Sequence, residues 1–147
     1  MAITRQEQFS GTKDVEAHLQ FDESSLASYL GEHIEGFAGP LRVKRFKGGQ
    51  SNPTYQLITP ENNYVMRRKP PGELLPSAHA VDREYRVISA LNRHGFPAPK
   101  PYILCEDTDI AGTMFYIMEM VEGRVFWDMS LPDQTPQERT AIYDAKI

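Results

Sequence analysis

The sequence predicts an α+β fold, in which five short antiparallel strands form one sheet and a single long helix lies between the third and fourth strands. Two observations support this prediction. Short runs of alternating apolar and polar residues recur between turn-forming residues, and one segment instead repeats its apolar residues every three or four positions. With 147 residues, 40% of them hydrophobic, the chain is long enough for one globular domain with a real core. A second complete domain is not expected.

The first periodic segment begins near residue 22. Residues 1–21 show no sustained period and are expected to form an N-terminal arm. The run FDESSLASYLGEHIEGF then predicts a short amphipathic helix, with Asp22 or Ser24 as its N-cap and Gly36 near its end. The apolar face of this helix contains Leu26, Tyr29, Leu30 and Ile34.

Three strands are expected after this helix. The runs LRVKRF, TYQLIT and NYVMRRK each have the short, alternating pattern of a strand. The turn sequence PENN separates the second run from the third. These three strands are therefore expected to pair antiparallel.

The main helix is predicted over SAHAVDREYRVISALNRHG, capped by Ser77 and stopped by Gly95. Its apolar face contains Ala78, Val81, Tyr85, Ile88 and Leu91. After the rigid segment FPAPKP, the runs YILCE and TMFYIMEMV predict the fourth and fifth strands, with DTDIAG as the turn between them.

The C-terminal segment differs from the rest of the chain. VEGRVFWDMSLPDQ has the composition of a loop, and TPQERTAIYDAKI opens a helix with Thr135 as N-cap, Pro136 in the first turn and Glu138 at the third position. The sequence supplies no later element against which this helix could pack. The expected organisation is an arm at 1–21, a lobe at 22–122, and a linker with the start of a truncated helix at 123–147.

Charge and cysteine content limit the partners and the compartment. The net charge is −4, and the 16 basic residues are scattered, so neither nucleic acid nor an anionic membrane is an expected partner. The single cysteine, Cys105, cannot form an internal disulfide, and the N-terminal segment lacks the apolar stretch of a signal peptide. No apolar segment approaches the ~20 residues of a spanning helix. A cytoplasmic location is expected.

The segment KGGQSNPTY joins the first two predicted strands. Its glycines would let backbone N–H groups approach an anion closely, because glycine has no Cβ atom and tolerates positive φ angles. Phosphate is one candidate anion. A plain hairpin turn is the alternative for this segment taken alone.

A basic residue in the third strand and an acidic residue in the next helix point to phosphate as the anion. Strand alternation places Val65, Arg67 and Lys69 on one face, and the following helix carries Glu84. In kinase-like folds, a base on the third strand reaches the α and β phosphates of the nucleotide, and a glutamate of the next helix holds that base. An ordinary ion pair between strand and helix is the alternative.

Several segments together resemble one family. The motifs GGQSNPTY, YVMRRKPPG, SAHAVDREYRVISAL, PAPKPY and GTMFYIMEMVEG are similar to the N-terminal lobe of aminoglycoside phosphotransferase-like (choline kinase-like) kinases. They look most like the branch whose kinase-like domain is associated with acyl-CoA dehydrogenases. The resemblance runs from about residue 41 to residue 132 and implies that the C-terminal catalytic lobe is absent from these 147 residues.

The resemblance implies a set of nucleotide-binding residues. Arg67, in the place of the usual lysine, would bind phosphate and pair with Glu84, Val65 would pack on adenine, and the segment MEMVEG would be the hinge. The backbone of Glu119 and Val121 would bond the adenine edge. The residues that would cover the triphosphate are Gly48, Gly49, Gln50, Ser51 and Asn52.

The catalytic part of such a kinase is not expected within this chain. The family implies ATP with magnesium, an aspartate that orients the substrate hydroxyl, and acidic or amide metal ligands from a later lobe. The HGF sequence at His94 has phenylalanine where that aspartate would stand, and Asp107 and Asp109 are expected in an exposed turn. No metal ligand is assigned to the four histidines, which are His18, His33, His79 and His94.

Three functions remain open at this stage. In the preferred one, the chain is part of a kinase that phosphorylates a hydroxyl of a small molecule or a hydroxyacyl thioester, is inactive alone and binds ATP weakly. In the second, it is a binding module whose open side docks a protein partner or a second copy over apolar residues such as Phe126, Trp127 and Ile142. In the third, it is a structural α+β domain.

Overall fold

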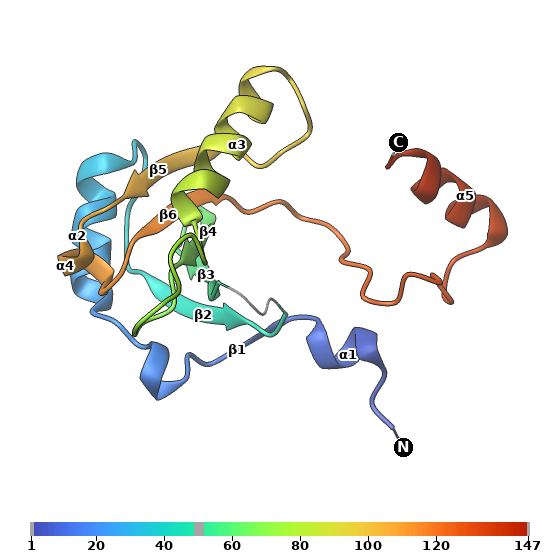
Figure 1. Cartoon of the computed structure of the whole chain (residues 1–147), viewed down its shortest axis with the longest axis horizontal. Coiled ribbons are helices and arrows are strands. Elements are labelled where there is room, and N and C mark those ends of the chain that lie inside the picture. The colour runs from blue at the N-terminus through green and yellow to red at the C-terminus, as the bar shows by residue number, and fades with distance from the viewer. Residues whose placement is uncertain (1, 49–51, 147) are drawn as a thin grey trace. The chain divides into compact units, whose positions relative to one another are not determined.

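The structure is a computed structural model that describes residues 2–48 and 52–146 (Figure 1). The chain divides into two compact units, one formed by residues 11–122 and the other by residues 1–10 together with 123–147. The larger unit contains the sheet and the candidate site.

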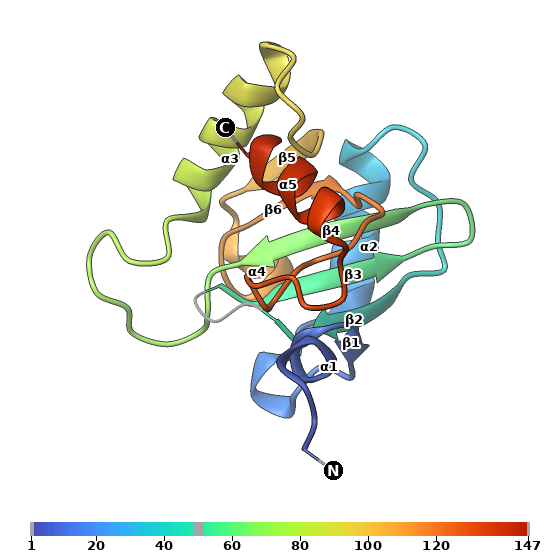
Figure 2. The same cartoon turned by 90° about the vertical axis from the view of Figure 1, so that its right-hand side faces the viewer.

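The larger unit is built on an antiparallel sheet with the strand order β1-β2-β3-β4-β6-β5, and its α+β class confirms the prediction (Figure 2). Five of the six strands are the predicted ones, and β1 is additional. The strand bounds are β1 Thr12–Lys13, β2 Arg42–Phe46, β3 Thr54–Ile58, β4 Asn63–Arg68, β5 Pro101–Cys105 and β6 Phe115–Glu119.

Strand β1 lies in the segment that the sequence assigns to an arm. It pairs with β2 through Thr12 opposite Phe46 and Lys13 opposite Arg45. A short 3₁₀ helix, η1 (Ala17–Leu19), follows it and buries Leu19. Residues 11–21 therefore extend the sheet and contribute to the core of the larger unit, and the two-residue strand is too short to show a period in the sequence.

The first predicted helix is α2 (Glu23–His33), whose N-cap is Asp22. The Asp22 carboxylate accepts hydrogen bonds from the backbone N–H groups of Ser24 (2.9 Å) and Ser25 (3.1 Å). Of the two predicted caps, the structure therefore uses the aspartate, which can satisfy two free N–H groups at once.

The main helix is α3 (Val81–Arg93), and it begins later than predicted. Its N-cap is Ala80, which makes no side-chain cap bond, whereas Ser77 has a φ of 68° and lies in the preceding loop. The prediction of Ser77 as the cap was therefore wrong. Gly95, with a φ of 74°, follows the last residues of the helix, as the stop signal predicted.

The turn predicted at DTDIAG is instead a short helix, α4 (Thr108–Ala111). The carboxylate of Asp107 caps it by accepting a bond of 2.9 Å from the N–H of Asp109. A single helical turn leaves no periodic pattern in a sequence, which explains the difference.

The two faces of the sheet have different neighbours. One face packs on α2 around a buried cluster, and the other face contacts α3 through β5 and β6. The buried cluster includes Leu26, Leu30, Tyr55, Leu57, Tyr64, Met66, Phe115 and Ile117. Because side chains alternate along a strand, Arg67 and Tyr116 point to the other face, where the candidate site lies.

Arg68 is a charged residue in the core, with 2% of its surface exposed. Its Nη1 donates to the carbonyl of Ala111 (2.6 Å), and its Nη2 donates to the carbonyl of Leu19 (2.7 Å) and to the hydroxyl of Tyr55 (3.0 Å). Its guanidinium also lies 4.9 Å from the ring centre of Phe21. Arg68 therefore joins the segment after β1, the strand β3 and the helix α4 at one point.

Glu16 holds the segment after β1 on the sheet through ion pairs with Lys13 and Arg45. The hydrogen bond from Lys13 lowers the pKa of Glu16 from 4.5 to about 2. Because the folded state has the lower pKa, this contribution to stability is complete above about pH 4.5 and is lost as the pH falls toward 2.

We expect Glu16→Gln to remove this acid-dependent contribution, which should be below ~1 kcal/mol because the carboxylate is partly exposed. The measurement is the free energy of unfolding in denaturant at several pH values between 2 and 6, compared with the exposed Glu32→Gln as the control. A wild-type acid dependence that Glu16→Gln leaves unchanged would show that these ion pairs do not stabilise the fold.

The smaller unit joins the two ends of the chain. Its helices are α1 (Arg5–Phe9) and α5 (Pro136–Asp144), each with a capping box, and the second of these confirms the predicted Thr135 cap. The side-chain amide of Gln6 donates to the carbonyl of Val125 (2.7 Å) and accepts from the N–H of Trp127 (3.0 Å), so it binds the backbone of the linker at two points. Phe9 packs on Trp127 with ring centres 5.4 Å apart.

Candidate functional site

The candidate site is a pocket of about 440 Å³ on the α3 side of the sheet. It lies between β4, β6, the loop before α3 and the first turns of that helix. Its polar side chains are Asn52, Arg67, Ser77, His79, Arg83, Glu84 and Tyr116. The pocket therefore places two arginines and a histidine near a single carboxylate.

Arg67 and Glu84 come together in this pocket. The Nε atom of Arg67 lies 3.3 Å from Oε2 of Glu84, and about a third of each side chain is exposed. The N–H of Arg67 is not aligned for a hydrogen bond, so the contact is an ion pair held by charge alone. A partly exposed pair of this kind contributes little to stability.

Glu84 is held mainly by two other residues. Its Oε1 accepts from Nδ2 of Asn52, and its Oε2 accepts from the hydroxyl of Tyr116, each at 3.0 Å. Burial and the nearby negative charge of Glu84 raise the pKa of Tyr116, so its hydroxyl keeps the proton that it donates. Two neutral donors therefore hold Glu84 in addition to its ion pair with Arg67.

Only part of the predicted triphosphate segment can be located. Gly48 and Asn52 are described, whereas Gly49, Gln50 and Ser51 lie outside the described residues. Asn52 is 3% exposed, and its side chain lines the pocket next to Glu84. The structure thus brings Asn52, Arg67 and Glu84 together.

The predicted adenine-contact residues lie outside this pocket. Val65 is 8% exposed and lies two residues before Arg67 on the same strand, opposite Met118 in β6. The backbone N–H of Glu119 already donates to the carbonyl of Lys100 (2.8 Å), so only the carbonyl of Glu119 could bond a nucleotide. Val121 is exposed and follows the end of β6. The adenine contacts of these three residues remain predictions.

Two residues that the sequence analysis did not assign to the site belong to its network. Tyr116 could have been found from strand alternation, because β6 places it beside Met118 and opposite Arg67. His79, whose Nδ1 lies 3.0 Å from Oδ1 of Asn52, left no such signal because it lies in a loop. No group of three His, Cys, Asp or Glu side chains that could hold a metal ion occurs within residues 2–48 and 52–146.

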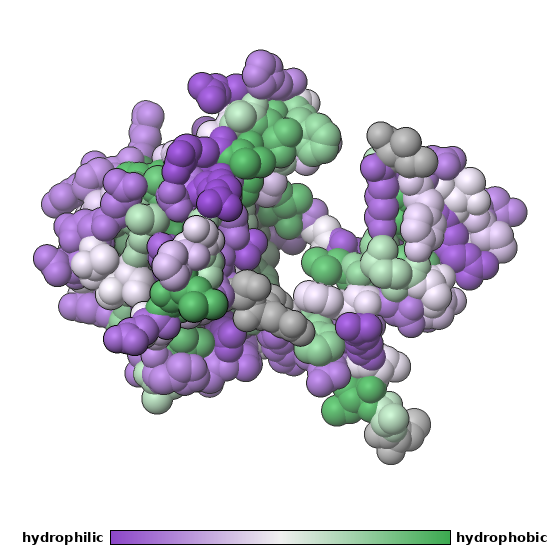
Figure 3. Space-filling model, in the orientation of Figure 1, coloured by the Kyte–Doolittle hydropathy of each residue, from purple (hydrophilic) through white to green (hydrophobic). Residues whose placement is uncertain are grey.

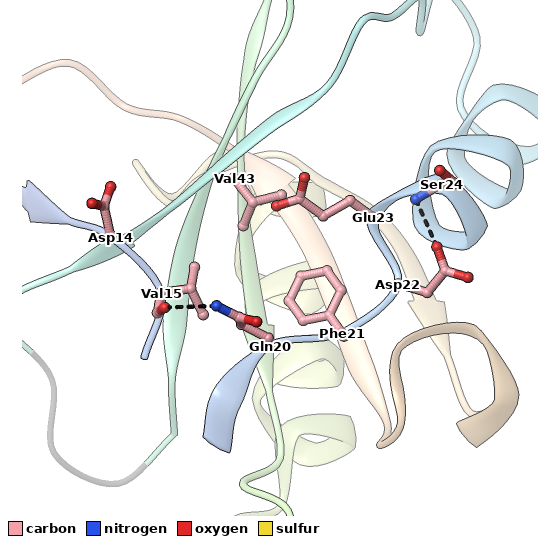
Figure 4. A pocket seen from close by; sticks show the side chains of 8 residues that line it. All are labelled: Asp14, Val15, Gln20, Phe21, Asp22, Glu23, Ser24 and Val43. Atoms are coloured by element: carbon pink, nitrogen blue, oxygen red, sulfur yellow. Dashed lines mark hydrogen bonds between the residues drawn. The ribbon is translucent and has the colours of Figure 1, made fainter. Parts of the chain in front are cut away.

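A larger pocket of about 700 Å³ lies on the opposite side of the larger unit, near the start of α2 (Figure 4). Its charged lining consists of three carboxylates, those of Asp14, Asp22 and Glu23, and Asp22 is already used as the helix cap. Carboxylates repel a polyphosphate at close range. The smaller pocket around Arg67 is therefore the better site for an anionic ligand.

The comparison with known families agrees with this arrangement. The family model described as "Phosphotransferase enzyme family" matches residues 42–146, which include the whole candidate pocket. The chain belongs to this phosphotransferase family.

Named relatives show which branch of the phosphotransferase family this chain resembles. The chain is 47% identical over 87% of its length to human acyl-CoA dehydrogenase family member 11, and 43% identical over 92% of its length to a probable acyl-CoA dehydrogenase of Arabidopsis thaliana. It covers 17% of the human protein and 18% of the plant protein, so the phosphotransferase-family chain spans about a sixth of these relatives. The predicted resemblance to this branch is confirmed.

A solved structure confirms the kinase-like N-terminal lobe. The chain superposes with a TM-score of 0.71 on a protein from Ralstonia eutropha JMP134 that is assigned as an aminoglycoside phosphotransferase. The two are 54% identical, and the match covers 85% of this chain and 35% of the other. Among the described residues of this phosphotransferase-family chain, none of the helices has the length and apolar character needed to cross a membrane.

Proposed function

We propose that this chain is the nucleotide-binding lobe of a phosphotransferase that transfers the γ-phosphoryl group of ATP to a hydroxyl group of a small molecule or a hydroxyacyl thioester. The observation that carries the proposal is the pairing of Arg67 with Glu84 in an open pocket. A strand base held by a helix carboxylate is the device with which kinase-like folds position the nucleotide phosphates. The acyl-CoA dehydrogenase names of the relatives support an acyl thioester as the acceptor.

The polar groups of the pocket fit a polyphosphate. Arg67 and Arg83 supply two guanidinium groups, and arginine binds phosphate oxygens with paired N–H donors. Arg83 forms no ion pair within the described residues, so its charge is available to a ligand. When ATP is bound, these cations would neutralise part of the phosphate charge and orient the chain of phosphates along the pocket.

The chemistry beyond binding is assigned to residues outside these 147. Magnesium accompanies ATP in the family, and the family resemblance implies that its ligands come from a later lobe. The aspartate that would orient the acceptor hydroxyl is likewise not assigned here. We therefore propose that the chain alone binds ATP weakly and transfers no phosphoryl group.

The proposal predicts where ATP should act. In a titration of the isotope-labelled 147-residue chain, we expect millimolar ATP to shift the amide NMR signals of Asn52, Arg67 and Glu84, because the phosphates would lie against them. Adenosine at the same concentration is the control, because it lacks the phosphates that the guanidinium groups recognise.

Two outcomes would contradict this function. A micromolar affinity measured by calorimetry would refute the claim that binding by the lobe alone is weak. Shifts confined to other parts of the chain, or no shifts at all, would remove the nucleotide role.

One surface favours a second candidate function, the docking of a protein partner. On α3 and the loop after it, Val87, Leu91 and Phe96 are all exposed, and Figure 3 shows hydrophobic residues gathered over this part of the molecule. If ATP leaves the signals of the pocket unchanged, this apolar surface becomes the leading site for function.

A further inference from the structure

The side-chain amide of Asn52 is buried and, within residues 2–48 and 52–146, hydrogen-bonds two side chains of the candidate pocket. Its Nδ2 donates to Oε1 of Glu84 and its Oδ1 faces Nδ1 of His79, each at 3.0 Å. It follows directly on the glycine-rich segment, whereas Glu84 lies in α3 and His79 in the loop before that helix. The amide therefore connects the end of the glycine-rich segment to the start of α3.

The chemistry of the three groups sets the direction of both hydrogen bonds. An ionised carboxylate can only accept, so the NH₂ end of Asn52 must face Glu84 and its oxygen must face His79. The imidazole must then carry a proton on Nδ1 in order to donate to that oxygen. The reverse orientation would place two acceptors, the Asn52 oxygen and the Glu84 carboxylate, 3.0 Å apart with no proton between them.

The loop that presents His79 has an unusual backbone. Ser77 and His79 both have positive φ angles, 68° and 57°, although neither is a glycine. Such conformations cost free energy and persist only where surrounding contacts hold them. His79 has two such contacts: its Nδ1 lies against the buried Asn52, and its carbonyl accepts from the N–H of Val81 (2.9 Å).

We propose that Asn52 and His79 are positioning residues of the nucleotide site. Asn52 holds the Glu84 carboxylate against Arg67, and His79 in turn holds Asn52 in the orientation that allows this. Together they fix the Arg67 guanidinium where a phosphate would bind, and they tie Asn52, which follows the glycine-rich segment, to α3 and the loop before it. The role of Arg67 in binding phosphate rests on the proposed function, whereas the hydrogen bonds of Asn52 with Glu84 and His79 do not.

The first experiment tests the geometry without any nucleotide. Long-range ¹H–¹⁵N NMR on the 147-residue chain at about pH 8, where an unperturbed imidazole is neutral, reports which ring nitrogen of His79 carries the proton. We expect the proton on Nδ1, and we expect Asn52→Ala to move His79 out of that state. A proton on Nε2 in the wild-type chain, or an unchanged His79 in Asn52→Ala, would overturn the proposal.

The second experiment tests positioning through ATP affinity. We expect Asn52→Ala and His79→Ala each to weaken ATP binding about threefold to tenfold, the value of one hydrogen bond. His79→Asn should retain most of the affinity, because the amide of asparagine can place a donor near the position of Nδ1. His94→Ala, at the other end of α3, is the matched control and should bind ATP like the wild type.

The outcomes separate this proposal from the proposed function. Unchanged ATP affinity in Asn52→Ala and His79→Ala, together with a lowered melting temperature, would mean that the pair is only a structural contact and would overturn the positioning role. If the wild-type chain itself shows no ATP-dependent signals, the proposed function and the positioning role both fail. The Nδ1 proton on His79 would in that case still establish the hydrogen-bonded link.

Discussion

Replacement of Arg68 by alanine is expected to lower the free energy of unfolding by about 3 kcal/mol. The side chain is 2% exposed and donates to two backbone carbonyls and the hydroxyl of Tyr55. Alanine would remove all three donors and leave a cavity between the sheet, η1 and α4. The measurement is denaturant unfolding at equilibrium, followed by circular dichroism.

Two further variants make the Arg68 result specific. Arg68→Met keeps most of the volume but removes the donors, so its loss of stability measures the hydrogen bonds with little contribution from a cavity. The exposed Arg42→Ala is the control and should change the free energy of unfolding by less than ~0.5 kcal/mol. If Arg68→Ala were as stable as Arg42→Ala, the buried guanidinium of Arg68 would not contribute to the stability of the fold.

Replacement of the neighbouring Arg67 by alanine should strongly weaken ATP binding but hardly change the stability of the fold. We expect ATP binding to fall at least about tenfold, because the charge-assisted bonds to phosphate are lost, whereas the free energy of unfolding should change by less than ~1 kcal/mol. The small effect on stability follows from the partly exposed ion pair and from the two other bonds that hold Glu84.

Arg67→Lys tests whether ATP binding depends on the positive charge alone or also on the planar shape of the guanidinium. Most kinase-like folds have lysine at this position, so we expect this variant to keep measurable ATP binding, with a changed pattern of NMR shifts. If Arg67→Ala bound ATP as well as the wild type does, the phosphate role of Arg67 would be wrong. The two adjacent arginines thus form a matched pair, because strand alternation sends one to the nucleotide side and the other into the core.

Much of the fold could be predicted from local patterns. Alternation in LRVKRF, TYQLIT and NYVMRRK gave β2, β3 and β4, and the three- to four-residue spacing gave α2 and α3. The pairing of Arg67 with Glu84 was predicted from the resemblance to kinase-like folds, in which a strand base meets an acidic residue of the next helix. The strands and helices depend on the spacing of residues that are close in sequence, and the ion pair depends on a known order of elements. Both can therefore be predicted from one sequence.

Other features could not be predicted from local sequence patterns. The two-residue strand β1 and the one-turn helix α4 are too short to show a period. The partners of Arg68 lie 13 to 49 residues away in the chain, and Asn52 lies 27 residues from His79. No spacing rule links such pairs, because they meet only after the sheet and the loops have folded.

By itself, the sequence determined the α+β class, the order of the predicted elements and the side of β4 on which each arginine lies, because these follow from the periods of strands and helices. Only the tertiary structure decided what each arginine meets. Arg68 became a buried centre because three distant segments converge on it, and Arg67 became a site residue because Tyr116 and Asn52 hold Glu84 beside it. Contacts of this kind arise from the packing of elements in space, which a linear pattern does not contain.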